Sequence, residues 1–492
     1  MLGALRLRLL AGLAVLLAGT TALANGRFPR AQRLQVDASE PSRLALYGTY
    51  GLATSTDAGQ SWSHVCEAAT GPFAGEAPLL ELLDGGRIVL SSEVGLRGAT
   101  FPACNWKGLL EPVLPATVQD ITREPTNGAG LVALLSQPDV TVGYRSALSR
   151  SDDAGATWSE SVPVPGEVLA QPLTVDVARS RPERVYLSGL NDAKQGVVAR
   201  SDDAGETWHG FPIAGLRASE LPYLAEIDAR EADRVFVRTD ALADFDGQLQ
   251  PDDALFFSAD GGESFTRVVS RRAKLLGFAI SPDGETILLG YGDPVLFAYA
   301  VEPEQSGLYR LRTADLFADP ATAASKLTKI LAGSVTCLRW TEQGLYACLA
   351  QAEQGFELGR ADDGEFSLAD EQPFTPLLDL RALTPLACEA ESTAAKCWSD
   401  PNLGWPAVCG KLDADCAATS GAAGAAGAPA SVGAAGTASS GHEPPSCGCR
   451  VAPARNGERW ALFAPLWLTS GVSAWAARRR RRSRRQLDTN AG

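Results

Sequence analysis

The stretch that decides the fold is Ser55-Thr-Asp57-Ala-Gly59-Gln-Ser61-Trp62, because the chain repeats its pattern. The same phrase, S-x-D-x-G-x-[ST]-[WF], begins again at Ser151, Ser201 and Ser258. Repetition at a fixed period indicates a repeat architecture and takes priority over the assignment of single elements. The residues that carry the four copies are Ser55, Asp57, Gly59, Trp62, Ser151, Asp153, Gly155, Trp158, Ser201, Asp203, Gly205, Trp208, Ser258, Asp260, Gly262 and Phe265.

The repeated phrase has the chemistry of a tight turn between two strands. Glycine adopts a positive φ without steric cost. The aspartate accepts backbone N–H groups inside the turn, and the hydroxyl groups do so more weakly. The terminal aromatic ring is large enough to pack between neighbouring sheets. We therefore expect these residues to be structural.

The phrase resembles the Asp-box, or BNR, repeat of the sialidase and sortilin type of β-propeller. The resemblance implies that the boxes lie on the periphery of the blades. A faded copy is present at Asp362-x-Gly364-x-Phe366. The aromatic anchors recur about every fifty residues, at Trp62, Trp106, Trp158, Trp208, Phe265, Phe317 and Phe366.

A period of this length suits a four-stranded blade. The sequence therefore predicts an all-β fold with a seven-bladed β-propeller over residues 30–380, and six blades are the alternative. Such a ring is expected to close by pairing the terminal strands in one blade, which removes its edges.

The ten cysteines predict disulfides in two places. Cys337 and Cys348 flank a turn and fall opposite each other, so a cross-strand disulfide is expected. Cys66 and Cys104 lie beside the first two aromatic anchors, which predicts a link between the first two blades. A small disulfide module is expected at 385–417, with pairs among Cys388, Cys397, Cys409 and Cys416. Sequence leaves its three connectivities open, and the spacing is not typical of zinc.

Both ends of the chain have the character of targeting segments. Residues 1–24 have a basic start, a short apolar run and a small-x-small site, which predicts a secretory signal peptide. A Gly/Ala/Ser linker occupies 418–446. After it come Cys447-Gly-Cys449, an apolar run at 460–477 that predicts a transmembrane helix, and an arginine cluster. Arginines placed directly after such a run favour a cytoplasmic location for the tail.

This order resembles the C-terminal sorting tail of myxobacterial surface proteins, the MYXO-CTERM signal, over residues 447–486. The resemblance implies cleavage near the cysteine motif, with Cys447 or Cys449 as the candidate for processing and lipidation. The alternative is an uncleaved single-span anchor. Either way, the protein is expected to be exported and attached to the cell envelope.

Few catalytic motifs are visible. The net charge of −14 argues against nucleic acid as a partner. The sequence contains no H-E-x-x-H zinc motif and no G-x-S-x-G nucleophile elbow, and neither a metal nor a cofactor is indicated. Sialidases use an arginine cluster with a Tyr–Glu pair and an Asp acid, but their early F/Y-R-I-P signature is missing. Arg145, Arg272 and Arg310 are candidate arginines with nothing to place them on the axis. The acidic stretch 240–253 lacks the calcium-loop register.

We therefore predict a non-catalytic, surface-anchored propeller that binds a protein or glycan partner. A sialidase-like glycoside hydrolase and a structural envelope scaffold are the alternatives. The side chains on the propeller axis discriminate between them. An arginine cluster around an acidic pair favours a hydrolase, a polar funnel without convergent charges favours binding, and an apolar plug favours a scaffold.

Overall fold

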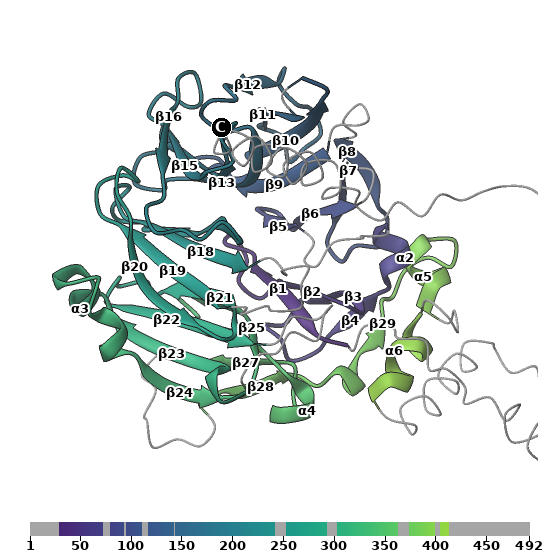
Figure 1. Cartoon of the computed structure of the whole chain (residues 1–492). Helices are drawn as coiled ribbons and strands as arrows, with labels where there is room; N and C mark the ends of the chain where they lie inside the picture. The colour runs from purple at the N-terminus through teal and green to yellow at the C-terminus, as the bar shows by residue number, and fades with distance from the viewer. Residues whose placement is uncertain are drawn as a thin grey trace, which may run out of the picture. The chain divides into compact units, whose positions relative to one another are not determined.

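The computed structural model describes residues 29–71, 79–92, 95–110, 117–141, 143–241, 252–292, 303–362, 373–398 and 404–412. Seven antiparallel sheets follow one another along the chain, each built from four consecutive strands (Figure 1). The sequence prediction of seven blades is therefore confirmed, and the six-bladed alternative is excluded.

The strands occupy the same order in every blade. The first strands are β1 (Ala31–Val36), β5 (Leu80–Leu83), β9 (Thr117–Arg123), β13 (Gln171–Val177), β17 (Glu220–Ile227), β21 (Lys274–Ile280) and β25 (Val335–Thr341). The second strands are β2 (Leu44–Gly48), β6 (Arg87–Ser92), β10 (Leu131–Asp139), β14 (Val185–Leu190), β18 (Val235–Ala241), β22 (Thr286–Gly292) and β26 (Gly344–Leu349). The third strands are β3 (Gly51–Ser55), β7 (Gly95–Thr100), β11 (Gly143–Ser151), β15 (Gly196–Ser201), β19 (Asp253–Ser258), β23 (Gly307–Arg312) and β27 (Leu358–Ala361). The fourth strands are β4 (Ser63–Val65), β8 (Lys107–Leu110), β12 (Val162–Val164), β16 (His209–Pro212), β20 (Thr266–Arg271), β24 (Thr328–Ala332) and β28 (Thr375–Leu378).

The first strands surround the propeller axis. Each contacts the first strand of the next blade, and β25 contacts β1, so the seven form a closed ring. Side chains fasten this ring by bonding to the backbone of the neighbouring blade. The Gln35 amide donates to the Leu80 carbonyl over 2.9 Å, and the Thr336 hydroxyl donates to the Ala31 carbonyl over 2.7 Å.

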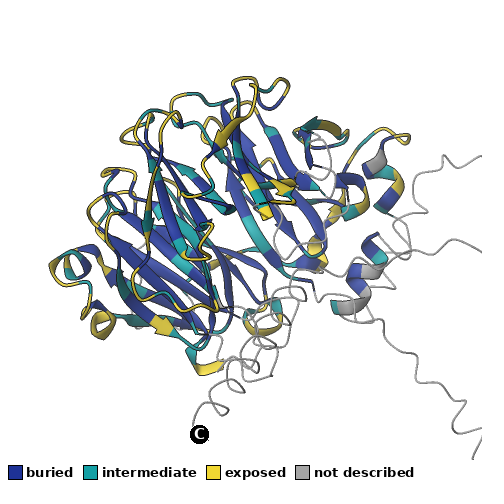
Figure 2. Ribbon diagram, turned by 45° about the horizontal axis from the view of Figure 1, so that its top comes forward, coloured by how far each residue is buried: buried dark blue, intermediate teal, exposed yellow. Residues whose placement is uncertain are grey.

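The hydrophobic core lies between the blades. One cluster joins Val132, Leu134 and Leu148 of blade 3 to Val185 and Leu187 of blade 4. The strands are largely buried and the connecting turns exposed (Figure 2). Short apolar strands suffice here because each sheet is covered on both faces by its neighbours.

Strands from both ends of the propeller meet in blade 1, as expected, but not as members of one four-stranded sheet. Each blade takes its four antiparallel strands from one continuous segment. The sheet of blade 1 gains a fifth strand, β29 (Thr384–Pro385), which pairs in parallel with the outer strand β4. The Thr384 hydroxyl donates to the Trp62 carbonyl over 3.0 Å. The segment that follows blade 7 therefore covers the outer edge of blade 1 and protects this edge from pairing with another chain.

Short helices connect and extend the blades. They are α2 (Glu67–Thr70), α3 (Thr313–Ala318), α4 (Gln351–Gln354), α5 (Thr393–Trp398) and α6 (Trp405–Leu412), with 3₁₀ turns η1 (Pro303–Gln305), η2 (Ala323–Lys326) and η3 (Leu380–Ala382). Among the residues that the structure describes, no helix is long and apolar enough to cross a membrane. The predicted span 460–477, the signal peptide, the linker and Cys447 and Cys449 lie outside the described residues.

The disulfide pairing of the C-terminal segment corrects the sequence prediction. Cys66 pairs with Cys397 and Cys104 pairs with Cys388, so the proposed Cys66–Cys104 link is wrong. The segment after the propeller runs back along blades 1 and 2, which brings its cysteines to theirs. It is therefore not a separate knot but a latch on the ring (Figure 1, green helices beside β3 and β4).

Two further cysteine predictions have different outcomes. Cys409 is also disulfide-bonded, and Cys416 lies outside the described residues. Cys337 and Cys348 are paired, with their Cα atoms 4.8 Å apart, as the hairpin register predicted.

Candidate binding site on the propeller axis

The four Asp boxes connect the third strand to the fourth in blades 1, 3, 4 and 5. In the blade 4 box, the Ser201 hydroxyl donates to Asp203 and accepts the Gly205 N–H, both over 2.7 Å. Asp203 also accepts the Thr207 N–H over 2.8 Å. Hydrogen bonds from the Thr207 hydroxyl and N–H lower the pKa of Asp203 to about 2. The carboxylate is therefore satisfied inside its own turn.

The aromatic residue of each box packs against the preceding blade. The Trp62 indole N–H donates to the Leu377 carbonyl of blade 7 over 3.0 Å. Trp208 shares a core cluster with Leu148 of blade 3. Sequence reasoning missed one detail of the boxes, which is that Ala58, Ala154 and Ala204 also have positive φ, at 57–58°.

The remaining anchors occupy the same connection but lack the box. Trp106 precedes β8, and Phe317 lies within α3, so a helix replaces the turn in blade 6. Phe366 and the faded box at Gly364 lie outside the described residues.

The arginines proposed from the sequence do not reach the axis together. Arg145 lies in a third strand, is exposed, and pairs with Asp139. Arg272 follows the outer strand β20, and Arg310 lies in the third strand β23. At the edge of the acidic stretch, Lys274 pairs with Asp240 and Asp253, and residues 242–251 lie outside the described residues.

A different set of charged residues converges on the axis. Six of the seven first strands contribute charged side chains to this set. Five of them contribute one carboxylate or one guanidinium group within the strand, and β9 contributes one of each. We name this set the axial cluster, and its members are Arg33 (β1), Glu81 (β5), Asp120 and Arg123 (β9), Asp176 (β13), Arg179 (directly after β13), Glu226 (β17) and Arg339 (β25).

Electrostatic interactions place these groups near one another. Burial and the nearby Asp176 carboxylate raise the pKa of Glu226 to about 7, although Arg339 opposes both. Burial also raises the pKa of Glu81, which Arg339 and Arg33 lower. Glu81, Glu226 and Arg339 belong to blades 2, 5 and 7. Coulomb interactions weaken with distance, and only the axis is close to all three blades.

Some members are held by hydrogen bonds across blades. Asp120 accepts the Val175 N–H of blade 4 over 2.9 Å, and Asp176 accepts the Thr122 hydroxyl of blade 3 over 3.1 Å. Burial raises the pKa of Asp120 to about 7, and Arg33 opposes this effect. These two carboxylates therefore help to fix the ring.

Other members have no such partners. Within the described part of the chain, Arg33, Arg179, Arg339, Glu81 and Glu226 form no ion pair within 4.0 Å and no side-chain hydrogen bond. The Arg339 Nε atom is buried without a hydrogen-bond partner. A buried charge without a partner costs stability, so it marks a candidate functional site.

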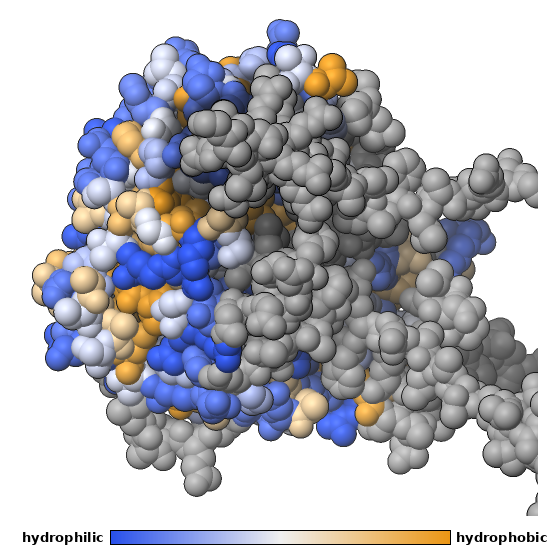
Figure 3. Space-filling model, viewed as in Figure 1, coloured by the Kyte–Doolittle hydropathy of each residue, from blue (hydrophilic) through white to orange (hydrophobic). Residues whose placement is uncertain are grey.

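The cluster lies toward the Asp-box end of the propeller. Most of its members occupy the last three positions of the first strands, next to the hairpins that lead into the second strands. In a four-stranded antiparallel blade these hairpins and the third-to-fourth turns share one face. The face drawn in Figure 3 mixes hydrophilic with smaller hydrophobic areas.

The sequence contained a weak signal for this site. Glu81 stands inside Leu79-Leu-Glu-Leu-Leu83 and Arg339 inside Cys337-Leu-Arg-Trp340, so each is one charge in a buried strand. The sequence does not show that the two residues are close, because they approach each other only in the closed ring. Among the described residues, no group of three or more His, Cys, Asp or Glu side chains is arranged to hold a metal.

Comparisons with known proteins find only distant similarities of structure. No protein-family model matches the chain, and no curated protein matches it. Among solved structures, an ancestral GH74 enzyme matches with a TM-score of 0.49 and 13% identity, over 70% of this chain and 46% of that chain. The GH74 enzyme of Niastella koreensis matches with a TM-score of 0.35 and 14% identity, over 68% of this chain and 59% of that chain. YCF48 from Cyanidioschyzon merolae matches with a TM-score of 0.40 and 11% identity, over 65% of this chain and 92% of that chain.

Proposed function

We propose that the protein is an exported, surface-anchored propeller that binds a protein or glycan partner through the axial cluster. The observation that carries the proposal is the set of axial charges without ion pairs, above all Glu226 and Arg339. A partner with hydrogen-bond donors and acceptors satisfies both signs of charge, and this removes the cost of leaving them unpaired.

The test compares the full-length protein with a Glu226→Gln/Arg339→Gln double variant. The probes are a peptide of alternating lysine and glutamate and three oligosaccharides: maltotriose, chitotriose and tri-galacturonate. We expect saturable binding of at least one probe in isothermal titration calorimetry, and binding at least tenfold weaker in the double variant. Glutamine has the shape of Glu226 and is shorter than Arg339, and it removes a buried charge at each position, so the variant should remain folded.

The matched control is Glu263→Gln, which removes an exposed carboxylate on the periphery that lies 3.1 Å from Arg200. This variant should bind like the unmodified protein. Absence of binding by every probe, or equal binding by the double variant, contradicts a ligand-binding role for the axis.

A glycoside hydrolase is the second candidate, and one observation favours it. Asp120 and Glu226 have pKa values raised to about 7, and arginines lie near them. A carboxyl group that is protonated near neutral pH is what a general acid requires. Release of reducing ends from the three oligosaccharides, lost in Glu226→Gln, would identify a hydrolase instead of a binding protein.

Surface anchoring is a separate part of the proposal and rests on the terminal segments. We expect the mature protein at the cell surface to lack residues 478–485 and to carry lipid at Cys447 or Cys449. One acyl chain gives only marginal membrane attachment, so two or more chains are expected. Mass spectrometry of the mature C-terminus tests this, and a peptide that contains the arginine cluster in the bulk of the protein excludes processing.

A further inference from the structure

Arginines bridge the Asp boxes of blades 4 and 5 to the blade before each of them. In blade 3, Arg150 donates to the Ala204 carbonyl in the box of blade 4 over 3.1 Å. In blade 4, Arg200 donates to the Gly261 carbonyl in the box of blade 5 over 2.9 Å. Gly261 and Ala204 occupy the same position of their boxes. The two arginines therefore make the same contact one blade apart.

Blade 2 lacks this arginine. Arg150 pairs with Val132 and Arg200 with Tyr186, on the faces of their blades that point to the next blade. In blade 2 the face toward blade 3 carries Leu96 and, two and four residues later, Gly98 and Thr100, so Thr100, which pairs with Arg87, stands at this position. The box that faces Thr100 belongs to blade 3, where Ala154 is the counterpart of Ala204. Thr100 is too short to fill the space that an arginine of the third strand fills in the next two blades.

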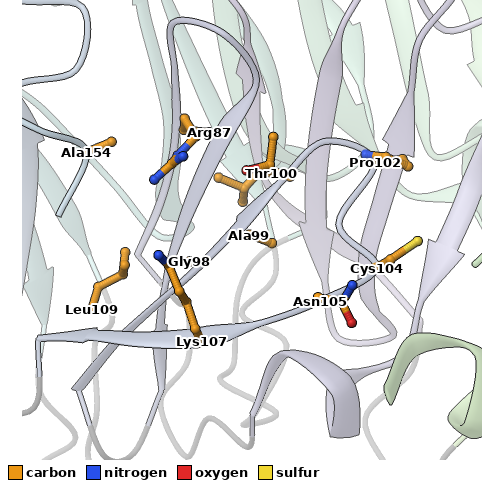
Figure 4. A pocket seen from close by; sticks show the side chains of 11 residues that line it. Arg87, Gly98, Ala99, Thr100, Pro102, Cys104, Asn105, Lys107, Leu109 and Ala154 are labelled. Atoms are coloured by element: carbon orange, nitrogen blue, oxygen red, sulfur yellow. The ribbon is translucent and has the colours of Figure 1, made fainter. Parts of the chain in front are cut away.

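A cavity of about 350 Å³ occupies this place, and both Thr100 and Ala154 line it (Figure 4). Two cations enter the same space, because Arg87 from β6 and Lys107 from β8 point their nitrogen atoms into it. Among the residues that the structure describes, its lining contains no Asp or Glu. Within the described part of the chain, neither Arg87 nor Lys107 has an ion pair or a side-chain hydrogen bond.

The other lining groups are mixed in polarity. Thr100 and Asn105 provide hydrogen-bonding side chains, and Ile88, Pro102 and Leu109 provide apolar surface. The nearby Asp153 does not neutralise the cations, because it accepts the N–H and the hydroxyl of Thr157 within its own box. Small-molecule sites combine an apolar wall with a few converging polar groups and start at volumes of roughly 300 Å³.

We propose that this cavity binds one hexuronate unit of an acidic glycan, independently of the axial site. The carboxylate lies between the Arg87 guanidinium and the Lys107 ammonium, where charge-assisted hydrogen bonds are strongest. The sugar hydroxyl groups donate to the Ala154 carbonyl, as Arg150 and Arg200 do to its counterparts. The apolar face of the ring packs against Leu109 and Pro102.

Ligand-observed NMR titration of the full-length protein tests the proposal. The probes are D-glucuronate, its methyl β-glycoside, D-glucose and N-acetyl-L-glutamate. We expect millimolar binding of glucuronate and of its glycoside, weakened by salt. Glucose should not bind, because it lacks the carboxylate. If N-acetyl-L-glutamate binds as tightly as glucuronate, the cavity recognises a carboxylate and not a sugar. If the methyl glycoside does not bind, the cavity does not accept a hexuronate unit that is part of a glycan chain.

Three variants locate the site. Arg87→Gln and Lys107→Gln should each weaken glucuronate binding at least fivefold, and Lys194→Gln, which removes an exposed cation in blade 4, should leave it unchanged. Thr100→Arg places in blade 2 the side chain that blades 3 and 4 possess, so it should fill the cavity and abolish binding without lowering the melting temperature. Unchanged glucuronate binding in folded Thr100→Arg protein overturns the proposal.

Discussion

At the scale of single residues, the hydroxyl group that opens each Asp box connects the turn to its carboxylate. Ser201 is fully buried and accepts the Gly205 N–H. Ser201→Ala leaves this donor unpaired in the interior, so we expect the free energy of unfolding to fall by about 1–3 kcal/mol. Denaturant unfolding measures the change. Ser180→Ala, an exposed serine in a turn of the same blade, is the control and should be nearly neutral.

Box residues were predictable because their chemistry is local. The serine, aspartate and glycine of one box lie within five residues, so the sequence alone implies their contacts. The positive φ of Ala154 was not predictable, because alanine ordinarily avoids this conformation and only the surrounding hydrogen bonds enforce it. Likewise, the cavity beside Thr100 follows from comparing the blades in register rather than from the residue itself.

At the scale of elements, the segment after the propeller behaves as a latch on blades 1 and 2. His64 of β4 contacts Trp398 and Trp405, with ring centroids 5.6 and 5.3 Å apart, and the two indoles stack on each other. The latch was not predictable as such, because the cysteines of blades 1 and 2 are close in sequence to each other and about 300 residues from their partners.

The two latch disulfides tie the same segment to the ring, so either one alone keeps it attached. We expect Cys66→Ala/Cys397→Ala and Cys104→Ala/Cys388→Ala each to lower the free energy of unfolding by roughly 2–4 kcal/mol. Removing both pairs should cost more than the sum, because the loop that either bond closes in the absence of the other is far longer. Combining either change with Cys337→Ala/Cys348→Ala, which opens a separate hairpin, should be additive. If the losses from removing the two latch disulfides add to each other as simply as each adds to the loss from Cys337→Ala/Cys348→Ala, the two bonds do not hold one shared latch.

At the scale of the whole molecule, the ring brings together what the sequence keeps apart. The number of blades was predictable because the aromatic anchors repeat along the chain. The axial cluster was not, because its members come from six blades and no strand shows in its own sequence which charges of the other blades it will meet. The contacts between successive first strands, completed by those of β25 with β1, decide which charges meet.

Three buried carboxyl groups, two of them in the axial cluster, make the stability of the protein depend on pH. The pKa values of Asp120, Glu226 and Glu357 are raised to about 7 by burial, so the folded protein retains protons that the unfolded chain has lost. Their contribution to stability is complete below about pH 4 and disappears as the pH rises through 7. His64 acts in the opposite direction, because burial lowers its pKa to about 4 and its contribution is lost as the pH falls from about 6.5 to 4.

Because three carboxyl groups with raised pKa values oppose one histidine with a lowered pKa, the loss of stability toward neutral pH should dominate. We expect the melting temperature to be highest near pH 5 and to fall between pH 5 and 7.5, as measured by calorimetry in a constant ionic strength. Glu226→Gln removes one titrating group while keeping its shape, so it should flatten part of this decline, whereas Glu263→Gln on the exposed periphery should not. A melting temperature that instead rises from pH 5 to 7.5 in the unmodified protein would mean that the axial carboxylates are stabilised in their charged form. In that case the axis is an ion-paired structural plug, and the reason for placing a ligand there is lost.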